Sequence, residues 1–393
     1  MGVPITYNLR NLAERKATTI MTAVGIGLTV AVLVTAMALT AGLNSVFAGS
    51  GDPRQVLVLR TGVDAELSST ISTDAYQIIR QLPGIAVAPA APGATEGEPM
   101  VSPEGLTVVN LPSVDSPEGM NVTVRGMLPV GLAMRTVSVD QGKMFEEGKR
   151  QVVVGDSIAR RYPNARIGKQ VRFGRGMWEV VGVFHSGESA ANSEIWTDLN
   201  QLRGDFERQG GSSSLLIRTN GDAAIESLKK TIDNDQRLNA HVIREKDYYA
   251  ALTSSGMPLQ FLGFSVAVIM AIGSAFAATN TMYAAVARRS REIGTLRALG
   301  FGRWAILRSF MLESICLALL GGLLGVLITL PVNGFTTGVG NFQTFSEVAF
   351  KFKITPQAVA IGLLFAGLIG ALGGFLPAWA AGKKGIVAAM RDA

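Results

Sequence analysis

The sequence predicts an α-helical membrane protein with four transmembrane helices and a large α+β domain inserted between helices 1 and 2. Four stretches of its 393 residues contain almost no charge: 17–51, 248–287, 309–346 and 354–382. Each is long enough to cross a bilayer, which takes about 20 predominantly apolar residues. Residues 52–247 differ from these stretches, because charges are scattered through them and Gly and Pro separate short apolar runs.

The distribution of Lys and Arg predicts the orientation. Cations gather before the first span, between the second and third, and after the fourth: Arg10, Arg15, Lys16, Arg288, Arg289, Arg291, Arg297, Arg303, Arg308, Lys383, Lys384 and Arg391. Cytoplasmic loops carry such an excess. We therefore expect a multi-pass protein of the bacterial inner (cytoplasmic) membrane, with both termini cytoplasmic and the large domain periplasmic. The pI near 9.5 then reflects topology, and we expect no nucleic-acid partner.

Nine segments follow from these spans. They are a cytoplasmic amphipathic segment (1–16), helix 1 (17–48), a periplasmic core domain (49–255), helix 2 (256–287), a cytoplasmic loop with a short helix (288–307), helix 3 (308–333), a short periplasmic loop (334–355), helix 4 (356–381) and a cytoplasmic C-terminus (382–393). The apolar run 20–43 is longer than the 7–15 residues of a signal-peptide core, so helix 1 is expected to be a retained anchor.

The large domain reads as mixed α and β. Short or alternating apolar runs predict strands, and helical periodicity predicts helices. The strands are expected at 55–60, 106–111, 121–125, 151–154, 170–173, 178–184 and 213–218, and the helices at 73–81, 157–162 and 222–233. The single cysteine, Cys316, lies in helix 3, and His185 and His241 stand alone in the sequence. We expect no disulfide and no metal site in this domain.

The second uncharged stretch is longer than a bilayer requires. Its forty residues would form about 60 Å of helix, against roughly 30 Å of hydrocarbon. Gly256 and Pro258 are expected to interrupt it, which leaves a helical stem outside the membrane.

Small residues at helical spacing predict close contacts between spans. Gly321 and Gly325 share one helix face, as do Gly370 and Gly374, and such pairs let another backbone approach. Further small residues that could serve similarly are Gly25, Gly27, Ala271, Ser274 and Ala278. Glu313, the one charge inside a predicted span, is expected to pair with Arg308 near the cytoplasmic interface.

The loop between helices 2 and 3 predicts a short amphipathic helix. Ile293, Leu296 and Leu299 recur at helical spacing among charged residues, and Gly300 and Gly302 end the run. The apolar edge of such a helix could enter a groove on a partner. The alternative is an arginine-rich loop that only fixes topology.

Several segments together resemble one known family. The stretches concerned are 8–12, 19–27, 142–159, 178–184, 291–300, 313–325, 374–381 and 386–391. They are similar to the FtsX-like permease of MacB-type, or type VII, ABC transporters, and they occur in the same order over nearly the whole chain.

This resemblance implies a coupling helix that contacts an ABC ATPase. By position its residues are Arg291, Glu292, Ile293, Leu296, Arg297, Leu299 and Gly300, with Glu292 as the polar contact and Ile293, Leu296 and Leu299 as the apolar ones. The sequence has no Gly-x-x-x-x-Gly-Lys-Ser/Thr loop to cradle nucleotide phosphates, so ATP and Mg²⁺ are expected on a separate partner and no cofactor on this chain.

The resemblance also implies the assembly and the function. One coupling segment per chain predicts two permeases related by a two-fold axis, with two ATPases. The permease would transmit ATP-driven movement to its periplasmic domain, and so drive export or extraction of a substrate from the periplasm or from the outer leaflet of the inner membrane. Whether an adaptor and an outer-membrane channel join the complex stays open.

Three other interpretations remain. An FtsX-like role would have the domain activate a periplasmic cell-wall hydrolase. A protein of another class, a membrane sensor, would bind a ligand outside and signal through the cytoplasmic loop. A membrane-embedded enzyme is disfavoured, because no His-Glu-x-x-His or Gly-x-Ser-x-Gly motif is present.

Overall fold

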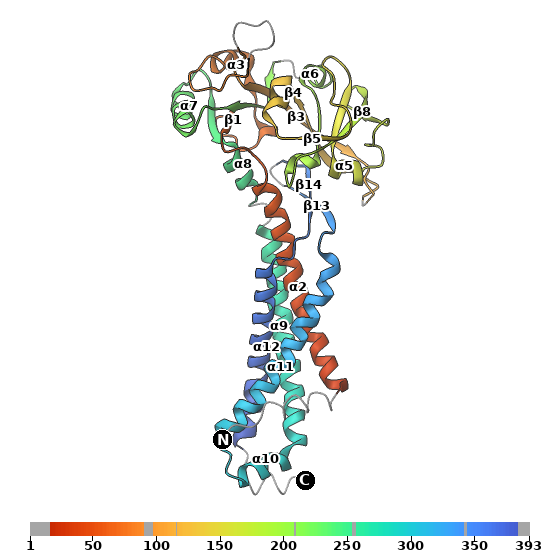
Figure 1. Ribbon diagram of the computed structural model, residues 1–393, viewed down its shortest axis with the longest axis vertical. Helices are drawn as coiled ribbons and strands as arrows, with labels where there is room; N and C mark the ends of the chain where they lie inside the picture. Colours follow the sequence, from red (N-terminus) through yellow and green to blue (C-terminus); the bar gives the residue numbers. More distant parts are fainter. Residues whose placement is uncertain are drawn as a thin grey trace. The chain divides into compact units, whose positions relative to one another are not determined.

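The structure, a computed structural model, describes residues 16–89, 97–114, 116–207, 210–253, 257–341 and 344–383. These residues form two compact units (Figure 1). The helical unit is drawn from the described parts of 1–42, 256–335 and 351–393, and the β-rich unit from those of 43–255 and 336–350. The predicted amphipathic segment before helix 1 and most of the predicted C-terminal segment lie outside the described residues.

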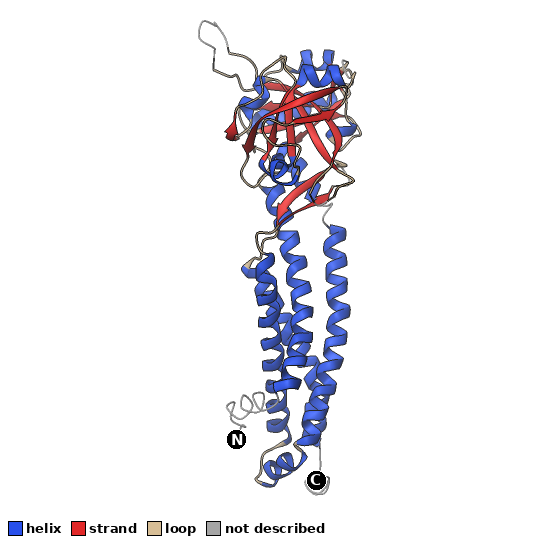
Figure 2. Cartoon of the chain, turned by 90° about the vertical axis from the view of Figure 1, so that its right-hand side faces the viewer, coloured by secondary structure: helices blue, strands red, loops and turns tan. Residues whose placement is uncertain are grey.

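Four long helices dominate the helical unit, and they run side by side in both views (Figures 1 and 2). Their bounds are α2 (Lys16–Ala48), α9 (Met257–Arg288), α11 (Arg303–Thr329) and α12 (Pro356–Lys383). Each is long and apolar enough to cross a membrane. The short helix α10 (Ser290–Ala298) lies between α9 and α11, and the 3-10 turn η4 (Leu330–Val332) follows α11. Among the described residues, these four long apolar helices lie where the hydropathy of the sequence predicts spans.

Glycines bring the backbones of these helices close together. A Cβ added at Gly321 would lie 2.7 Å from the Ala23 carbonyl oxygen of α2, and one at Gly325 would lie 2.4 Å from the Gly27 carbonyl oxygen. On α12, a Cβ at Gly370 would lie 2.5 Å from the Ala318 side chain. Such distances leave no space for a side chain, so α2 and α12 pack on α11 only because these positions are glycine.

Hydroxyl groups add hydrogen bonds across the same helices. Thr29 Oγ1 lies 2.7 Å from Ser274 Oγ, which ties α2 to α9. Ser314 Oγ donates to the Gly370 carbonyl at 2.7 Å, close to Gly374, whose Cβ would lie 2.5 Å from Ser314 Cβ. These bonds place the polar groups of the spans between helices, where lipid cannot solvate them.

The β-rich unit contains the remaining strands and short helices. Its strands are β1 (Gln55–Arg60), β2 (Ile71–Ser72), β3 (Val101–Leu111), β4 (Met120–Met127), β5 (Ser138–Gly142), β6 (Gln151–Gly155), β7 (Gln170–Phe173), β8 (Gly176–His185), β9 (Glu194–Asp198), β10 (Gly211–Ser212), β11 (Ser214–Arg218), β12 (Ala240–Arg244), β13 (Thr336–Gly340) and β14 (Glu347–Lys351). Its helices are η1 (Glu66–Ser68), α3 (Thr73–Ile79), α4 (Pro129–Met134), α5 (Asp156–Arg161), η2 (Ala190–Ser193), α6 (Leu199–Asp205), α7 (Asp222–Asn234) and α8 (Glu245–Leu252). All seven predicted strands and all three predicted helices of the domain are confirmed, with bounds shifted by a few residues.

One mixed sheet runs through this unit, in the order β12-β1-β11-β3-β4-β9-β6-β8-β5, with β7 on β8. The long strand β3 connects two halves, because its first residues pair with β11 and residues from Gly105 onward pair with β4. Each half has its own core. The first lies under α3 and α7 around Val58 and Ile217, and the second surrounds Trp178 and Val154.

The forty-residue apolar stretch is helical on both sides of residues 254–256. The helix α8 is described up to Leu252, in the β-rich unit, and α9 from Met257 onward. Gly256, one of the two residues predicted to interrupt the stretch, lies outside the described residues.

The segment 334–355, predicted as a short loop, instead contains strands β13 and β14. These strands pair with each other, and residues 336–350 belong to the β-rich unit. The buried Glu347 forms a 2.6 Å ion pair with Arg161, and Ser193 Oγ accepts a 2.9 Å hydrogen bond from the Ala349 N–H. The expectation that this unit consists of 49–255 alone was therefore incomplete, because these contacts depend on residues far apart in the sequence.

A buried ion cluster joins the two halves of the sheet. Arg125 is 2% exposed, and its guanidinium contacts the carboxylates of Glu66, Glu104 and Glu194 at 2.9, 2.6 and 2.9 Å. Arg135 shares Glu104 at 2.7 Å. Because each buried charge has hydrogen-bonded partners of opposite sign, the cluster keeps its charges away from water without leaving them unpaired.

Candidate functional site

The loop between α9 and α11 forms the helix α10, with well-defined ends. The Gly300 N–H donates to the Arg297 carbonyl at 3.1 Å, and the Phe301 N–H donates to the Leu296 carbonyl at 3.1 Å. This pair of bonds is a Schellman motif, and Gly300 supplies the left-handed backbone that it needs, with φ at +92°. Gly300 thus ends α10 as the sequence predicted, and Gly302 precedes α11.

Ile293 attaches α10 to the spans. Its side chain is 1% exposed and belongs to a cluster with Val286 of α9, Phe310 of α11 and Ala378 of α12. A side chain buried in this way has no surface left for a partner. The expectation that Ile293 contacts an ATPase therefore does not hold. Ile293 instead anchors α10 to the spans.

The residue just before α10 makes a second attachment. Arg289 Nη1 donates to Glu313 Oε2 at 2.7 Å, and both side chains are about 5% exposed. The Arg289 guanidinium also lies 5.7 Å from the centre of the Phe310 ring. The prediction that Glu313 pairs with Arg308 was wrong. The partner is Arg289, which the fold brings to Glu313 from the end of α9, while Arg308 is exposed one turn earlier on α11.

The other predicted residues of α10 lie toward its outer face. Arg291, Glu292 and Leu299 are exposed, with Leu299 at 72%, and Leu296 and Arg297 are half-buried. Glu292 Oε2 lies 3.6 Å from Arg289 Nε, so its carboxylate is oriented by the same arginine that pairs with Glu313. The structure therefore brings an acidic and an apolar side chain together on one exposed helix face.

Two residues of this site were missed by the sequence analysis. Arg289 is one of six arginines between the second and third spans, and the sequence does not distinguish it from the others. Only Glu313, a carboxylate inside a span that needs a cation, could have pointed to it. Trp304, at the start of α11, is 73% exposed. Its signal was present, because a tryptophan two residues after the helix-breaking sequence Gly-Phe-Gly, next to an arginine, is typical of a membrane interface.

Comparison with known proteins places the chain in a family. A model of the MacB-like periplasmic core domain matches residues 19–235, and a model of the FtsX-like permease C-terminal domain matches residues 264–386. Together these two matches cover most of the β-rich unit and most of each of the four long helices. The chain is a MacB/FtsX-like ABC transporter permease.

Relatives of this permease occur in several bacteria. The uncharacterized ABC transporter permease YknZ of Bacillus subtilis is 26% identical over 70% of this chain and 71% of its own. The macrolide export ATP-binding/permease protein MacB of Bdellovibrio bacteriovorus is 26% identical over 69% of this chain and 44% of its own. The permease thus spans less than half the length of this MacB relative. The solved extracellular domain of YknZ from Gram-positive bacteria matches 48% of this chain at 16% identity, with a TM-score of 0.36.

Proposed function

We propose that this permease transmits the ATP-driven movement of a separate ABC ATPase to its β-rich unit, and thereby drives export or extraction of a substrate from the periplasm or the outer leaflet. The observation that carries the proposal is the double attachment of α10. Ile293 is buried against three spans, and Arg289 is ion-paired to Glu313 of α11. A push on α10 would therefore displace the spans, because no loose segment lies between them and the helix.

The exposed face of α10 supplies the contacts for that ATPase. Glu292 offers a charged group held in place by Arg289, and Leu299 offers an apolar group at the end of the helix. Helix-in-groove recognition uses such a combination, with apolar side chains for affinity and a charge for orientation. Leu296 lies between them and completes the surface.

In the proposed arrangement both termini and α10 are cytoplasmic and the β-rich unit is periplasmic, as the positions of Lys and Arg favour. Two copies of the permease would act with two ATPases, which bind ATP and Mg²⁺, because each chain has one α10 and ATP-binding-cassette domains work in pairs. An adaptor and an outer-membrane channel would be partners in a tripartite pump. The match to the MacB core domain supports the export role over activation of a hydrolase.

Coupling can be tested with the ATPase that copurifies with the full permease from its host. Reconstituted in nanodiscs, the wild-type complex should hydrolyse ATP at a rate that depends on the permease. Glu292→Lys should abolish this dependence while the four spans still insert. The matched control is Glu118→Lys, which makes the same charge change at an exposed residue of the β-rich unit.

A crosslink gives an independent measurement. In a Cys316→Ser background, Leu299→Cys should crosslink to the ATPase, whereas Ile293→Cys should not, because its side chain is buried. Failure to recover any ATPase, or normal coupling in Glu292→Lys together with no crosslink from position 299, would refute the proposal.

A further inference from the structure

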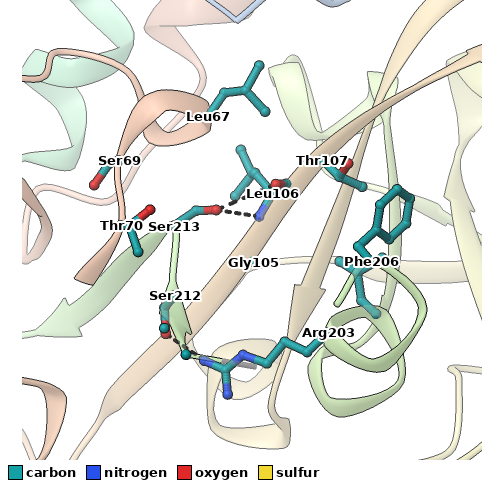
Figure 3. Close-up of a pocket in the computed structure, with 13 residues that line it drawn as sticks. Leu67, Ser69, Thr70, Gly105, Leu106, Thr107, Arg203, Phe206, Ser212 and Ser213 are labelled. Carbon is teal, nitrogen blue, oxygen red and sulfur yellow. Dashed lines mark hydrogen bonds between the residues drawn. The ribbon is translucent and has the colours of Figure 1, made fainter. Parts of the chain in front are cut away.

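A pocket lies between the two halves of the β-rich unit. Its volume is about 370 Å³, within the range of pockets that bind small molecules. The segment after η1, the middle of β3, the helix α6 and the strand β10 form its walls (Figure 3). None of its lining residues belongs to α10 or to the spans.

Arg203 of α6 forms one side of this pocket. Its Nη2 donates to Ser212 Oγ at 2.7 Å, across the lower part of the pocket in Figure 3. Its Nε–H is buried, and no described residue accepts a hydrogen bond from it. Burial lowers the pKa of Arg203, and among the described residues only the Tyr76 phenol acts in the opposite direction. The guanidinium thus lies partly out of water without a carboxylate to compensate its charge.

Two more deeply buried arginines of the same unit differ from the half-buried Arg203 in having carboxylate partners. Arg125 and Arg135 are each paired with carboxylates at 2.6 to 2.9 Å. A buried charge without a counter-ion destabilises a protein, and a buried N–H without an acceptor adds to that cost. Arg203 lines the pocket without a carboxylate partner among the described residues, so its charge is available to an anion in the pocket.

The rest of the pocket is mainly apolar. Leu67 and Leu106 lie on the side away from Arg203, and Phe206, which directly follows α6, lies beside Thr107 (Figure 3). Such walls bind hydrocarbon, whereas a guanidinium binds an oxyanion through parallel N–H groups. The apolar walls and the Arg203 guanidinium line the same pocket.

From this juxtaposition we infer that the pocket is a binding site for an anionic amphiphile, whose oxyanion head accepts hydrogen bonds from Arg203 and Ser212 and whose apolar tail packs on Leu67, Leu106 and Phe206. A carboxylate and a phosphate monoester share this chemistry. Because the Nε–H of Arg203 is buried, its terminal Nη N–H groups form the edge that either head would occupy.

The test measures binding to the full permease in nanodiscs, without ATP, by equilibrium dialysis of radiolabelled octanoate, octyl phosphate and octanol. Empty nanodiscs give the background from lipid partitioning. The variants are Arg203→Gln, Arg203→Lys and the control Arg172→Gln, which removes a charge at an exposed position of β7. Circular dichroism and thermal unfolding check that each variant is folded.

We expect saturable binding of at least one of the two anions to the wild type, weakened about tenfold in Arg203→Gln by loss of charge-assisted hydrogen bonds. Arg203→Lys should also weaken it, because an ammonium lacks the paired N–H edge. Arg172→Gln should bind like the wild type. Octanol should bind wild type and Arg203→Gln alike, since its tail contacts do not involve the charge.

Preference for octanoate or for octyl phosphate would identify the head group. The inference is overturned if neither anion shows saturable binding, or if both bind Arg203→Gln and Arg203→Lys as they bind the wild type. If Arg203→Gln does not fold, Arg203→Lys alone decides between these outcomes. Failure here leaves the coupling proposal intact, because the two sites share no residue.

Discussion

The Tyr162 hydroxyl donates a 2.5 Å hydrogen bond to Glu347 Oε2, in the interior of the β-rich unit. Tyr162 follows α5, and Glu347 begins β14, which comes from the segment between α11 and α12. Arg161 completes the site with an ion pair to the same carboxylate. One buried carboxylate therefore contributes two of the contacts that hold the segment between the last two spans in the unit.

Removal of this hydrogen bond should loosen β13 and β14. Tyr162→Phe leaves Glu347 buried with one partner fewer, which costs about 1 to 3 kcal/mol. The free energy of unfolding should fall by that amount, and hydrogen exchange should accelerate in residues 344–351. Tyr76→Phe, on the half-buried α3, is the control and should change neither measurement. Unaltered exchange in Tyr162→Phe would contradict the assignment.

Loss of one partner of the Arg289–Glu313 pair should destabilise the helical unit. Glu313→Ala removes the buried carboxylate that pairs with Arg289, and the loss of one partner of a buried ion pair costs about 3 to 5 kcal/mol. Thermal unfolding in detergent should show a clearly lower Tm. Replacing both residues, as in Arg289→Met with Glu313→Leu, should restore much of the stability, since an apolar pair of similar size is often neutral.

Arg308→Gln is the control for this pair. Arg308 is exposed, and its replacement should leave the free energy of unfolding within about 0.5 kcal/mol of the wild type. A larger loss of stability in Arg308→Gln than in Glu313→Ala would indicate that Glu313 pairs with Arg308. That result would contradict the attachment of α10 through Arg289.

Close packing of α2 on α11 predicts strong sensitivity at Gly325. A Cβ there would lie 2.4 Å from the Gly27 carbonyl oxygen, which is backbone and cannot turn aside. Gly325→Ala should therefore destabilise the unit by about 1 to 3 kcal/mol, as overpacked cores do. Gly273→Ala is the matched control, because its added methyl group meets no atom within 4 Å. Equal Tm values for the two variants would contradict this packing.

The ion cluster around Arg125 predicts the response of the β-rich unit to acid. Burial acts to raise the pKa of Glu66, but the charge and hydrogen bonds of Arg125 outweigh it and hold that pKa below the ordinary 4.5. A carboxylate with a lowered pKa stabilises the fold above its unfolded pKa, and this contribution is lost as the pH falls through its folded pKa. The free energy of unfolding should therefore decline below pH 4.5.

Glu66→Gln tests this dependence. The variant should be less stable at neutral pH by about 3 to 5 kcal/mol, because Arg125 loses a buried partner. Its stability should then depend less steeply on pH below 4.5, since no proton binds at position 66. Identical slopes in wild type and variant, measured by urea unfolding from pH 3 to 7, would show that Glu66 carries no part of the acid response.

Much of the β-rich unit followed from local pattern, and the misses share a cause. The strand β1 was found because its apolar residues are consecutive and bounded by turns. The strand β5 was missed because all five of its residues are exposed, so it has no apolar pattern. Likewise β9, Glu-Ile-Trp-Thr-Asp, places charged ends in a buried strand, where Arg125 satisfies Glu194.

The sequence by itself determined the four spans, the helix α10 and its end at Gly300. A helix in a bilayer satisfies its own backbone hydrogen bonds, so local apolarity and glycine spacing are enough to specify it. Only the tertiary structure decided that Ile293 is buried, that Glu313 pairs with Arg289, and that β14 joins the β-rich unit. Those contacts depend on which distant side chains the fold brings within hydrogen-bond or van der Waals distance, and no local pattern encodes that.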